Sequence, residues 1–225
     1  MLQLVINNVT KTYAVDNQSL HAVRNVSLEI TKGDFISIVG HSGSGKTTLL
    51  SLIGGITTPS SGSILFEDKD LAALGSDHLS EYRCDQVGFM FQFASLLPML
   101  TVKENLLLPA VFAAKEARNT AGDKAIDLLR KVGLVDKIHA FPAQLSGGQQ
   151  RRVAIARAFM NDPVVVLADE PTGDLDEETE ASMMDFFKDM NESKGITLIM
   201  VTHNTDLARQ AKRLCRMDFG SLTSV

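Results

Sequence analysis

Cysteine, long apolar runs and basic charge are all scarce in this sequence. Its two cysteines, Cys84 and Cys215, lie far apart, and neither has another cysteine or a histidine at the spacing of a metal site. The sequence therefore gives little support to a disulfide framework or a zinc site as the basis of the fold. We expect two ordinary thiols.

No apolar stretch is long enough to cross a bilayer. The longest, such as residues 164–168, have the length of a strand, whereas a spanning helix needs roughly 20 apolar residues. The amino terminus has no cation before Lys11 and no apolar segment followed by a small-residue cleavage site, so no secretion signal is predicted. These absences predict a cytoplasmic chain that does not itself span a membrane.

Positive charge is in deficit, with 22 Lys and Arg against 27 Asp and Glu and a net charge of −5. This balance argues against a protein that coats nucleic acid through bulk charge, so any bound anion must be held by local geometry. The composition, 44% hydrophobic and 22% charged, is that of a soluble globular protein. The 225 residues contain no separating linker or internal repeat, and we expect one domain over residues 1–225.

Short β-branched runs alternate with segments of helical period, which predicts an α/β fold with a mainly parallel core sheet. Core strands are predicted over residues 35–39, 87–91, 164–168 and 197–201. Residues 2–9, 26–30 and 63–66 have strand character without helices between them, which predicts a smaller antiparallel β subdomain near the amino terminus.

Two sets of apolar residues recur at i, i+3, i+4 and i+7, the spacing of a buried helical face. They are Ala125, Leu128, Leu129 and Val132, and Met183, Phe186, Phe187 and Met190. The segment from about 95 to 160 is mostly helical in pattern, so we expect a helical subdomain inserted in the core there.

The first predicted core strand runs into Gly40-His41-Ser42-Gly43-Ser44-Gly45-Lys46-Thr47, a full match to G-x-x-x-x-G-K-[ST]. Glycines in such a loop let successive backbone N–H groups point at phosphate oxygens, and the following helix adds its partial positive charge. Lys46 supplies a full charge for the β and γ phosphates, and the Thr47 hydroxyl is placed to ligate Mg²⁺. The loop predicts a nucleotide triphosphate site.

Acidic residues follow another core strand. Asp169 can hold Mg²⁺, and Glu170 beside it is a candidate general base for the attacking water. An Asp-Glu pair after an apolar run is, by itself, equally typical of a solvated strand end.

Polar residues also follow two further core strands, Gln92 after one and His203 after the other. Ligands of open parallel sheets bind outside the carboxyl ends of the strands, so these residues and the phosphate loop are expected to converge on one crevice. A lone histidine here would more often be an ordinary loop residue, but His203 in this set can hydrogen-bond the γ-phosphate or the attacking water.

The segment Leu145-Ser146-Gly147-Gly148-Gln149 leads into a helical pattern. A hydroxyl, bare backbone N–H groups and the helix dipole would make a second surface for anions. Taken alone, the same segment is better interpreted as a serine N-cap followed by glycines in a loop.

Together these motifs resemble the nucleotide-binding subunit of an ATP-binding cassette (ABC) transporter, over essentially the whole chain. The resemblance identifies residues 40–47 as the Walker A loop, 145–149 as the signature, and 164–169 as the Walker B strand. Gln92 matches the Q-loop, Gly173-Asp174-Leu175-Asp176 the D-loop, and Tyr13 the aromatic residue that stacks on adenine.

The resemblance implies an ATPase of P-loop NTPase fold with ATP and Mg²⁺ as cofactors. Glu170, His203 and Lys46 would be catalytic, and Thr47, Gln92 and Asp169 would hold the metal. The residues implied to bind nucleotide are Tyr13, Gly40, His41, Ser42, Gly43, Ser44, Gly45, Lys46, Thr47, Thr48, Gln92, Ser146, Gly147, Gly148 and Gln149.

The resemblance also implies partners. Two copies would close head to tail, so that ATP on one Walker A loop is capped by Ser146 and Gly148 of the other copy. The subunit would sit on the inner face of the cell membrane through an integral membrane permease and would not bind nucleic acid. The finer likeness is to lipoprotein-releasing and macrolide-exporting ATPases, which implies an exporter or envelope-acting system. Asp174 departs from that branch, where Asn is the more familiar residue.

Two other readings use part of the same motifs. A soluble ABC ATPase acting on nucleic acid or ribosomes would have long coiled-coil insertions or two cassettes, and this sequence has neither. A P-loop kinase or GTPase has no need for residues 145–149.

Overall fold

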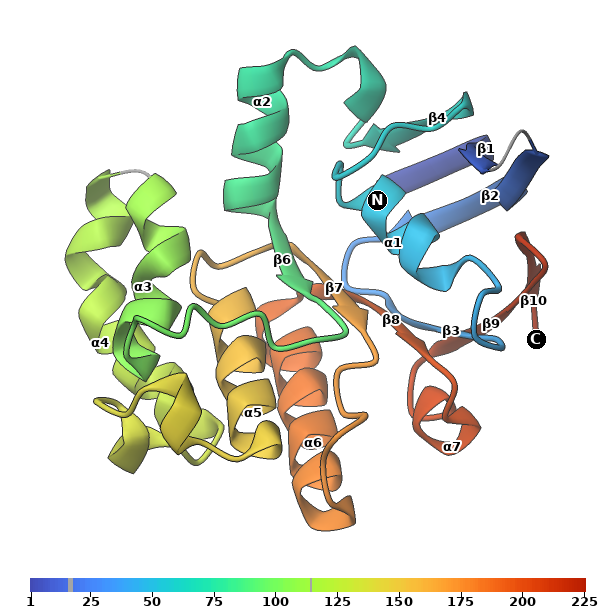
Figure 1. The fold of residues 1–225 in the computed structure, drawn as a ribbon. Helices are drawn as coiled ribbons and strands as arrows, with labels where there is room; N and C mark the ends of the chain where they lie inside the picture. Colours follow the sequence, from blue (N-terminus) through green and yellow to red (C-terminus); the bar gives the residue numbers. More distant parts are fainter. Residues whose placement is uncertain (16–17, 114) are drawn as a thin grey trace. The chain divides into compact units, whose positions relative to one another are not determined.

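The computed structural model describes residues 1–15, 18–113 and 115–225 (Figure 1). The chain forms two compact units. The first unit contains Met1–Arg83 and Thr197–Val225, and the second contains Cys84–Ile196. Each unit is described by itself.

The first unit contains the predicted antiparallel sheet near the amino terminus. Its strands, in the order β2-β1-β4-β5, are β1 (Leu2–Val15), β2 (Gln18–Thr31), β4 (Ser61–Phe66) and β5 (Lys69–Asp70). The first two are much longer than the sequence predicts. Asn8 and Asn25 both have a φ of 46°, and the β1–β2 register shifts at these positions. Such bulges break the two-residue alternation on which a sequence prediction depends.

The same unit holds a mostly parallel set of strands in the order β10-β9-β3-β8. The central strand β3 (Phe35–Val39) is buried along its whole length and pairs in parallel with β8 (Thr197–Thr202) and β9 (Arg213–Asp218). The strand β10 (Ser221–Ser224) returns antiparallel to β9. Strands β3 and β8 lie where the sequence predicts them, whereas the β9–β10 hairpin was not predicted. The helices of this unit are α1 (Lys46–Ile53), α2 (Ser76–Glu81) and α7 (Thr205–Ala208).

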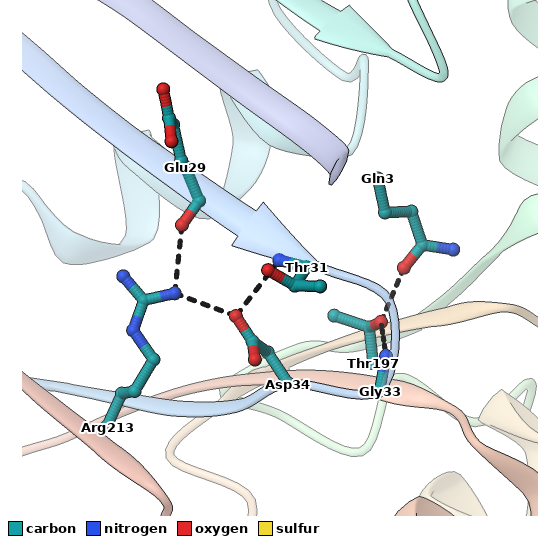
Figure 2. Close-up of polar contacts among 7 residues, drawn as sticks. All are labelled: Gln3, Glu29, Thr31, Gly33, Asp34, Thr197 and Arg213. Atoms are coloured by element: carbon teal, nitrogen blue, oxygen red, sulfur yellow. Dashed lines mark hydrogen bonds and ion pairs between the residues drawn. The ribbon is translucent and has the colours of Figure 1, made fainter. Parts of the chain in front are cut away.

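Polar side chains tie the start of the chain to this parallel sheet (Figure 2). Thr197, at the start of β8, donates its hydroxyl to the Gln3 side-chain carbonyl and accepts the Gly33 N–H at 2.9 Å. Arg213 on β9 pairs with Asp34 at 2.7 Å, just before β3 begins. Strands β1, β3, β8 and β9 are thus joined at one end by side-chain bonds as well as by packing.

The second unit is mainly helical. It contains the parallel pair β6 (Val87–Met90) and β7 (Val165–Asp169), and the helices α3 (Val102–Phe112), α4 (Lys115–Lys131), α5 (Gly147–Ala158) and α6 (Glu177–Lys194). Three of these helices lie between β6 and β7 in the chain, in the part of the sequence predicted to be helical. Both predicted apolar stripes are buried, one at α4 and one on α6. The α/β class with parallel core strands is confirmed.

No helix in the parts of the chain that the structure describes combines the length and the apolar character needed to cross a membrane. Both cysteines are free thiols, with Cys84 partly exposed and Cys215 buried. Burial raises the pKa of each thiol.

Candidate functional site

The phosphate loop of the first unit connects β3 to α1, as the sequence predicts. Gly45, the N-cap of α1, has a φ of 105°, a conformation that favours glycine. A Cβ atom on Gly45 would stand 2.1 Å from the carbonyl oxygen of Ala22, and one on Gly40 would stand 2.2 Å from that of Met217. The loop is therefore packed directly against the backbones of β2 and β9, and only glycine fits at these two positions.

Helix α1 begins with Lys46, and its first turn contains no acidic residue. Gly45 has no side chain with which to cap the helix, so the partial positive charge of the N-terminus is directed into the loop. The Lys46 ammonium donates to the carbonyl oxygens of Gly40 at 2.7 Å and His41 at 2.9 Å. This lysine is held against the loop it follows, where its charge can meet a phosphate.

The first unit also brings His203 to the loop's end of the sheet. Strands β3 and β8 are parallel and in register, with Val39 opposite Thr202. Gly40 follows β3 and His203 follows β8. These two residues therefore lie at the same end of neighbouring strands. His203 is exposed, and Asn204 after it caps α7 by accepting the N–H groups of Asp206 and Leu207.

Tyr13 lies on β1 in the same unit, with 38% of its surface exposed. It pairs with Leu20 of β2, two residues before the Ala22 that touches Gly45, so β2 connects the ring to the phosphate loop. The Lys11 ammonium lies 5.2 Å from the centre of the Tyr13 ring and donates to the Thr58 carbonyl at 2.7 Å. The Tyr13 ring is thus partly exposed on the strand that pairs with the one contacting the loop.

The second unit brings the other strand-end residues together. Strands β6 and β7 are parallel, with Met90 opposite Ala168, so Gln92 and the Asp169-Glu170 pair emerge at the same end. Asp169 is 3% exposed at the end of β7, and Glu170 has a φ of 46°. A left-handed conformation in a residue other than glycine costs on the order of 1–3 kcal/mol, and at Glu170 it follows directly on the buried acidic end of β7.

The turn after Glu170 is held by its own backbone. The N–H of Gly173 donates to the Glu170 carbonyl at 3.3 Å, and that of Leu175 donates to the Thr172 carbonyl at 3.0 Å. Asp176 then caps α6 by accepting the Thr179 N–H at 2.9 Å. That bond and a second from the Thr179 hydroxyl hold the pKa of the Asp176 carboxyl below its ordinary value.

Ser146 is the N-cap of α5, the helix that carries the predicted second anion surface. Its hydroxyl accepts the Gln149 N–H at 3.2 Å, while the Gln149 side-chain carbonyl accepts the Ser146 N–H at 2.9 Å, a reciprocal capping box. Gly147 and Gly148 form the first helical turn, and a Cβ on Gly147 would meet no atom within 4 Å. The helix therefore presents a side with little steric cover at its N-terminus.

The predicted site residues divide between the units. The first unit groups the phosphate loop, Thr48 on α1, His203 and Tyr13, and the second groups Gln92, Asp169, Glu170 and residues 146–149. The sequence reading missed the backbones that shape the loop: Met217 of β9 and the Gly220 N–H, which donates to the Ser44 carbonyl at 3.0 Å. The glycine turn between short alternating runs at residues 213–224 is the signal that would have predicted this hairpin.

Comparison with known proteins places these motifs in one family. The ABC transporter family model matches residues 23–173. The chain is 39% identical to the lipoprotein-releasing system ATP-binding protein LolD of Myxococcus xanthus, over 99% of each chain. It is 41% identical to the macrolide export ATP-binding/permease protein MacB of Mannheimia succiniciproducens, over 96% of this chain and 33% of that protein.

A solved structure shows the same fold over nearly the whole chain. The ATP-binding cassette MJ0796 of Methanocaldococcus jannaschii, a dimer in a post-hydrolysis state bound to ADP and Pi, superposes with a TM-score of 0.91 and 38% identity, over 98% of each chain. The phosphate loop, the acidic strand end and the capped signature helix thus occur in a P-loop NTPase fold. The chain belongs to the ABC transporter family, and it is an ATPase of that family.

Proposed function

We propose that this ATPase binds Mg²⁺ and ATP between two copies of itself and drives a separate membrane permease. The observation that carries the proposal is the presence of two helix N-termini suited to phosphate in different units of one chain. One is α1 behind the phosphate loop, and the other is α5, capped by Ser146. A head-to-tail dimer gives the second of them a role, because it places the α5 N-terminus of one copy over the ATP held by the other.

Nucleotide binding in this proposal begins in the first unit. The Tyr13 ring takes the adenine by stacking, while the N–H groups of the loop and the Lys46 ammonium take the phosphates. In the free loop this ammonium donates to the carbonyls of Gly40 and His41. Binding exchanges those neutral acceptors for charged phosphate oxygens, which form stronger bonds with an ammonium group.

The donor set fits a magnesium ion. The Thr47 hydroxyl, the Gln92 amide carbonyl and the Asp169 carboxylate are all oxygen donors, the type that Mg²⁺ prefers. When bound, Mg²⁺ neutralises charge that develops on the phosphates. The buried position of Asp169 at the end of β7 limits how far its carboxylate can move.

Hydrolysis needs a general base and a group that forms a hydrogen bond with the γ-phosphate. Glu170 takes the proton of the attacking water. Its left-handed backbone conformation sets the direction in which its side chain leaves the chain. His203 donates a hydrogen bond to the γ-phosphate from the end of β8. In the closed dimer, Ser146 of the other copy would contact the γ-phosphate. Hydrolysis would remove this contact, and the dimer would reopen.

The permease and its direction of transport are also part of the proposal. Support comes from the relatives, one named for macrolide export and one for a lipoprotein-releasing system, which favours an exporter or envelope-acting system. In the relative MacB, the name includes the permease, and this chain matches a third of that protein. The ATPase would then lie on the inner face of the membrane, held there by its permease.

The test compares wild-type protein with Glu170→Gln and Lys46→Ala. Glu170→Gln should abolish ATP turnover and accumulate an ATP-bound dimer on size-exclusion chromatography, because binding is intact and hydrolysis is blocked. Lys46→Ala should lose ATP binding by calorimetry and stay monomeric. Full turnover by Glu170→Gln would refute the assigned base, and co-purification with ribosomes in place of a membrane protein would refute the permease.

A further inference from the structure

Arg151, on the second turn of α5, connects three segments of the second unit. It is 4% exposed. One guanidinium nitrogen donates to the Phe91 carbonyl at 2.9 Å, and the other pairs with the Asp174 carboxylate at 3.3 Å. Phe91 immediately precedes Gln92, and Asp174 lies in the turn that follows Glu170. A single side chain thus joins the signature helix to the two strand ends of this unit.

The contact between α5 and the turn does not depend on this ion pair alone. A Cβ on Gly148 would stand 3.3 Å from a methyl of Leu175 and 3.6 Å from the Asp174 carbonyl oxygen. The first turn of α5 therefore lies directly against the Leu175 side chain and the Asp174 backbone. The turn is linked to Glu170 through the Gly173 N–H bond to the Glu170 carbonyl.

A second arginine of α5 holds the other side of Gln92. Arg157 donates to the Ser95 carbonyl at 2.9 Å and to the Ala94 carbonyl at 3.0 Å. The Arg157 side chain is partly buried, and this burial lowers its pKa. The segment around Gln92 is thus bound to α5 by backbone carbonyls before and after the glutamine.

Arg151 and Asp174, the two partners of the ion pair, differ in their exposure to solvent. The Arg151 side chain is 5% exposed and the Asp174 side chain 72% exposed. A buried guanidinium needs acceptors to offset the loss of water, and it has two, the Phe91 carbonyl and the Asp174 carboxylate. Among the described residues its Nε finds no acceptor. Asp174 is therefore the only full negative charge that the structure places on this guanidinium among the residues described.

We propose that Arg151 is a positioning residue for ATP hydrolysis, which makes the signature helix, the Gln92 segment and the turn after Glu170 move as one body. The ion pair with Asp174 holds the turn after Glu170 against α5, and the bond to the Phe91 carbonyl holds the segment around Gln92 against the same helix. A displacement at Gln92 then reaches both Ser146 and Glu170 through this side chain. The inference rests on the proposed function, because it assigns these three segments to one reaction.

The experiment measures kcat, KM for ATP and Tm for Arg151→Met, Asp174→Ala, Asp174→Asn and the double variant Arg151→Met/Asp174→Ala. Because an exposed partner contributes little, Asp174→Ala should lower kcat by about two- to fivefold. Arg151→Met loses both bonds and should lower kcat by about tenfold or more. The loss should fall mainly on kcat and less on KM, because none of the bonds described here joins Arg151 or Asp174 to the phosphate loop or to Tyr13, which take up the nucleotide in the proposal.

Coupling is the decisive readout. In the Arg151→Met background, Asp174→Ala should have no further effect on kcat, because its partner is already gone. Asp174→Asn retains the shape and one acceptor and should lie between wild type and Asp174→Ala. Multiplicative losses in the double variant, or lower Tm with unchanged kcat, would overturn the proposal. If Arg151→Met does not fold, unchanged kcat in Asp174→Ala overturns it equally.

A matched pair on α4 supplies the control. Arg130 and Asp127 form an exposed ion pair in the same unit, and neither contacts the three segments in any bond described here. Arg130→Met and Asp127→Ala should keep wild-type kcat. Glu170→Gln distinguishes failure of the proposed function from failure of the positioning role. If this variant retains ATP turnover, the proposed function fails and this inference fails with it. If Glu170→Gln is inactive while Arg151→Met retains wild-type kcat, only the positioning role fails.

Discussion

The Cα of Gly45 lies so close to the carbonyl oxygen of Ala22 that a Cβ atom would stand 2.1 Å from that oxygen. Strand β2 therefore sets the position of Gly45, the N-cap of α1. A side chain here would have to push the strand and the loop apart, and the φ of 105° would add strain. The shape of the phosphate loop thus depends on a contact between residues far apart in the sequence.

Gly45→Ala should consequently lose ATP affinity by more than about tenfold, which calorimetry would measure. Gly122→Ala is the control, because a Cβ on this α4 glycine meets no atom within 4 Å. It should raise the free energy of unfolding by about 0.5–1 kcal/mol and leave ATP affinity unchanged. Equal ATP affinity in Gly45→Ala and wild type would contradict the role of this contact.

Ser146 allows the capping role and the proposed phosphate role to be separated. Ser146→Ala should lose about 1 kcal/mol of stability, because the Gln149 N–H loses its acceptor. Ser146→Asp should keep the cap and the stability, since aspartate is an equally good N-cap residue. Both variants should lose ATP turnover, the second because a carboxylate would face the phosphates of the other copy. An active Ser146→Asp would argue against phosphate contact at this helix.

Much of the core could be predicted because its strands are buried on both faces. Strands β3, β7 and β8 are predominantly apolar and buried along their whole length, and the structure places them within one residue of the predicted bounds. The bounds of β1 and β2 could not be predicted, because the bulges at Asn8 and Asn25 interrupt the alternation.

The candidate site divides in the same way. Spacing alone predicts the phosphate loop and the Ser146 cap, because both are local patterns of glycine, hydroxyl and charge. The contacts that shape them are long-range and use backbone atoms, as at Ala22, or a charge pair between distant residues, as for Arg151 and Asp174. Every residue has a backbone carbonyl oxygen. No residue type in the sequence therefore marks the position whose carbonyl will pack against the phosphate loop.

Asp176 predicts a dependence of stability on pH. Two bonds from Thr179 lower the pKa of its carboxyl below the ordinary value of 3.8. A lowered pKa in the folded state stabilises the protein above the unfolded pKa, and the contribution is lost as the pH falls through the folded pKa. Asn at this position keeps the cap without the charge.

Wild-type protein should therefore be more stable than Asp176→Asn at pH 7, and the difference should shrink as the pH falls below about 4. Urea unfolding of both proteins at pH 7, 4 and 3 measures this difference in the free energy of unfolding. A difference that is constant across this range would show that the carboxylate charge has no part in the cap.

Thr197 tests how strongly the first unit depends on the polar bonds of Figure 2. Thr197 is fully buried and Gln3 nearly so, and the threonine hydroxyl serves both Gln3 and the Gly33 N–H. Thr197→Val keeps the shape but removes the hydroxyl that bonds to these two polar groups. Each bond lost in this way costs about 1–3 kcal/mol, so the free energy of unfolding should fall by about 2–4 kcal/mol.

The double variant Gln3→Leu/Thr197→Val should recover part of this loss, because it also removes the orphaned amide of Gln3. Thermal and urea unfolding measure both variants, and ATP affinity per folded molecule should remain that of wild type. A Thr197→Val protein as stable as wild type would mean that water replaces the hydroxyl. In that case packing alone would hold the start of β1 to the parallel sheet.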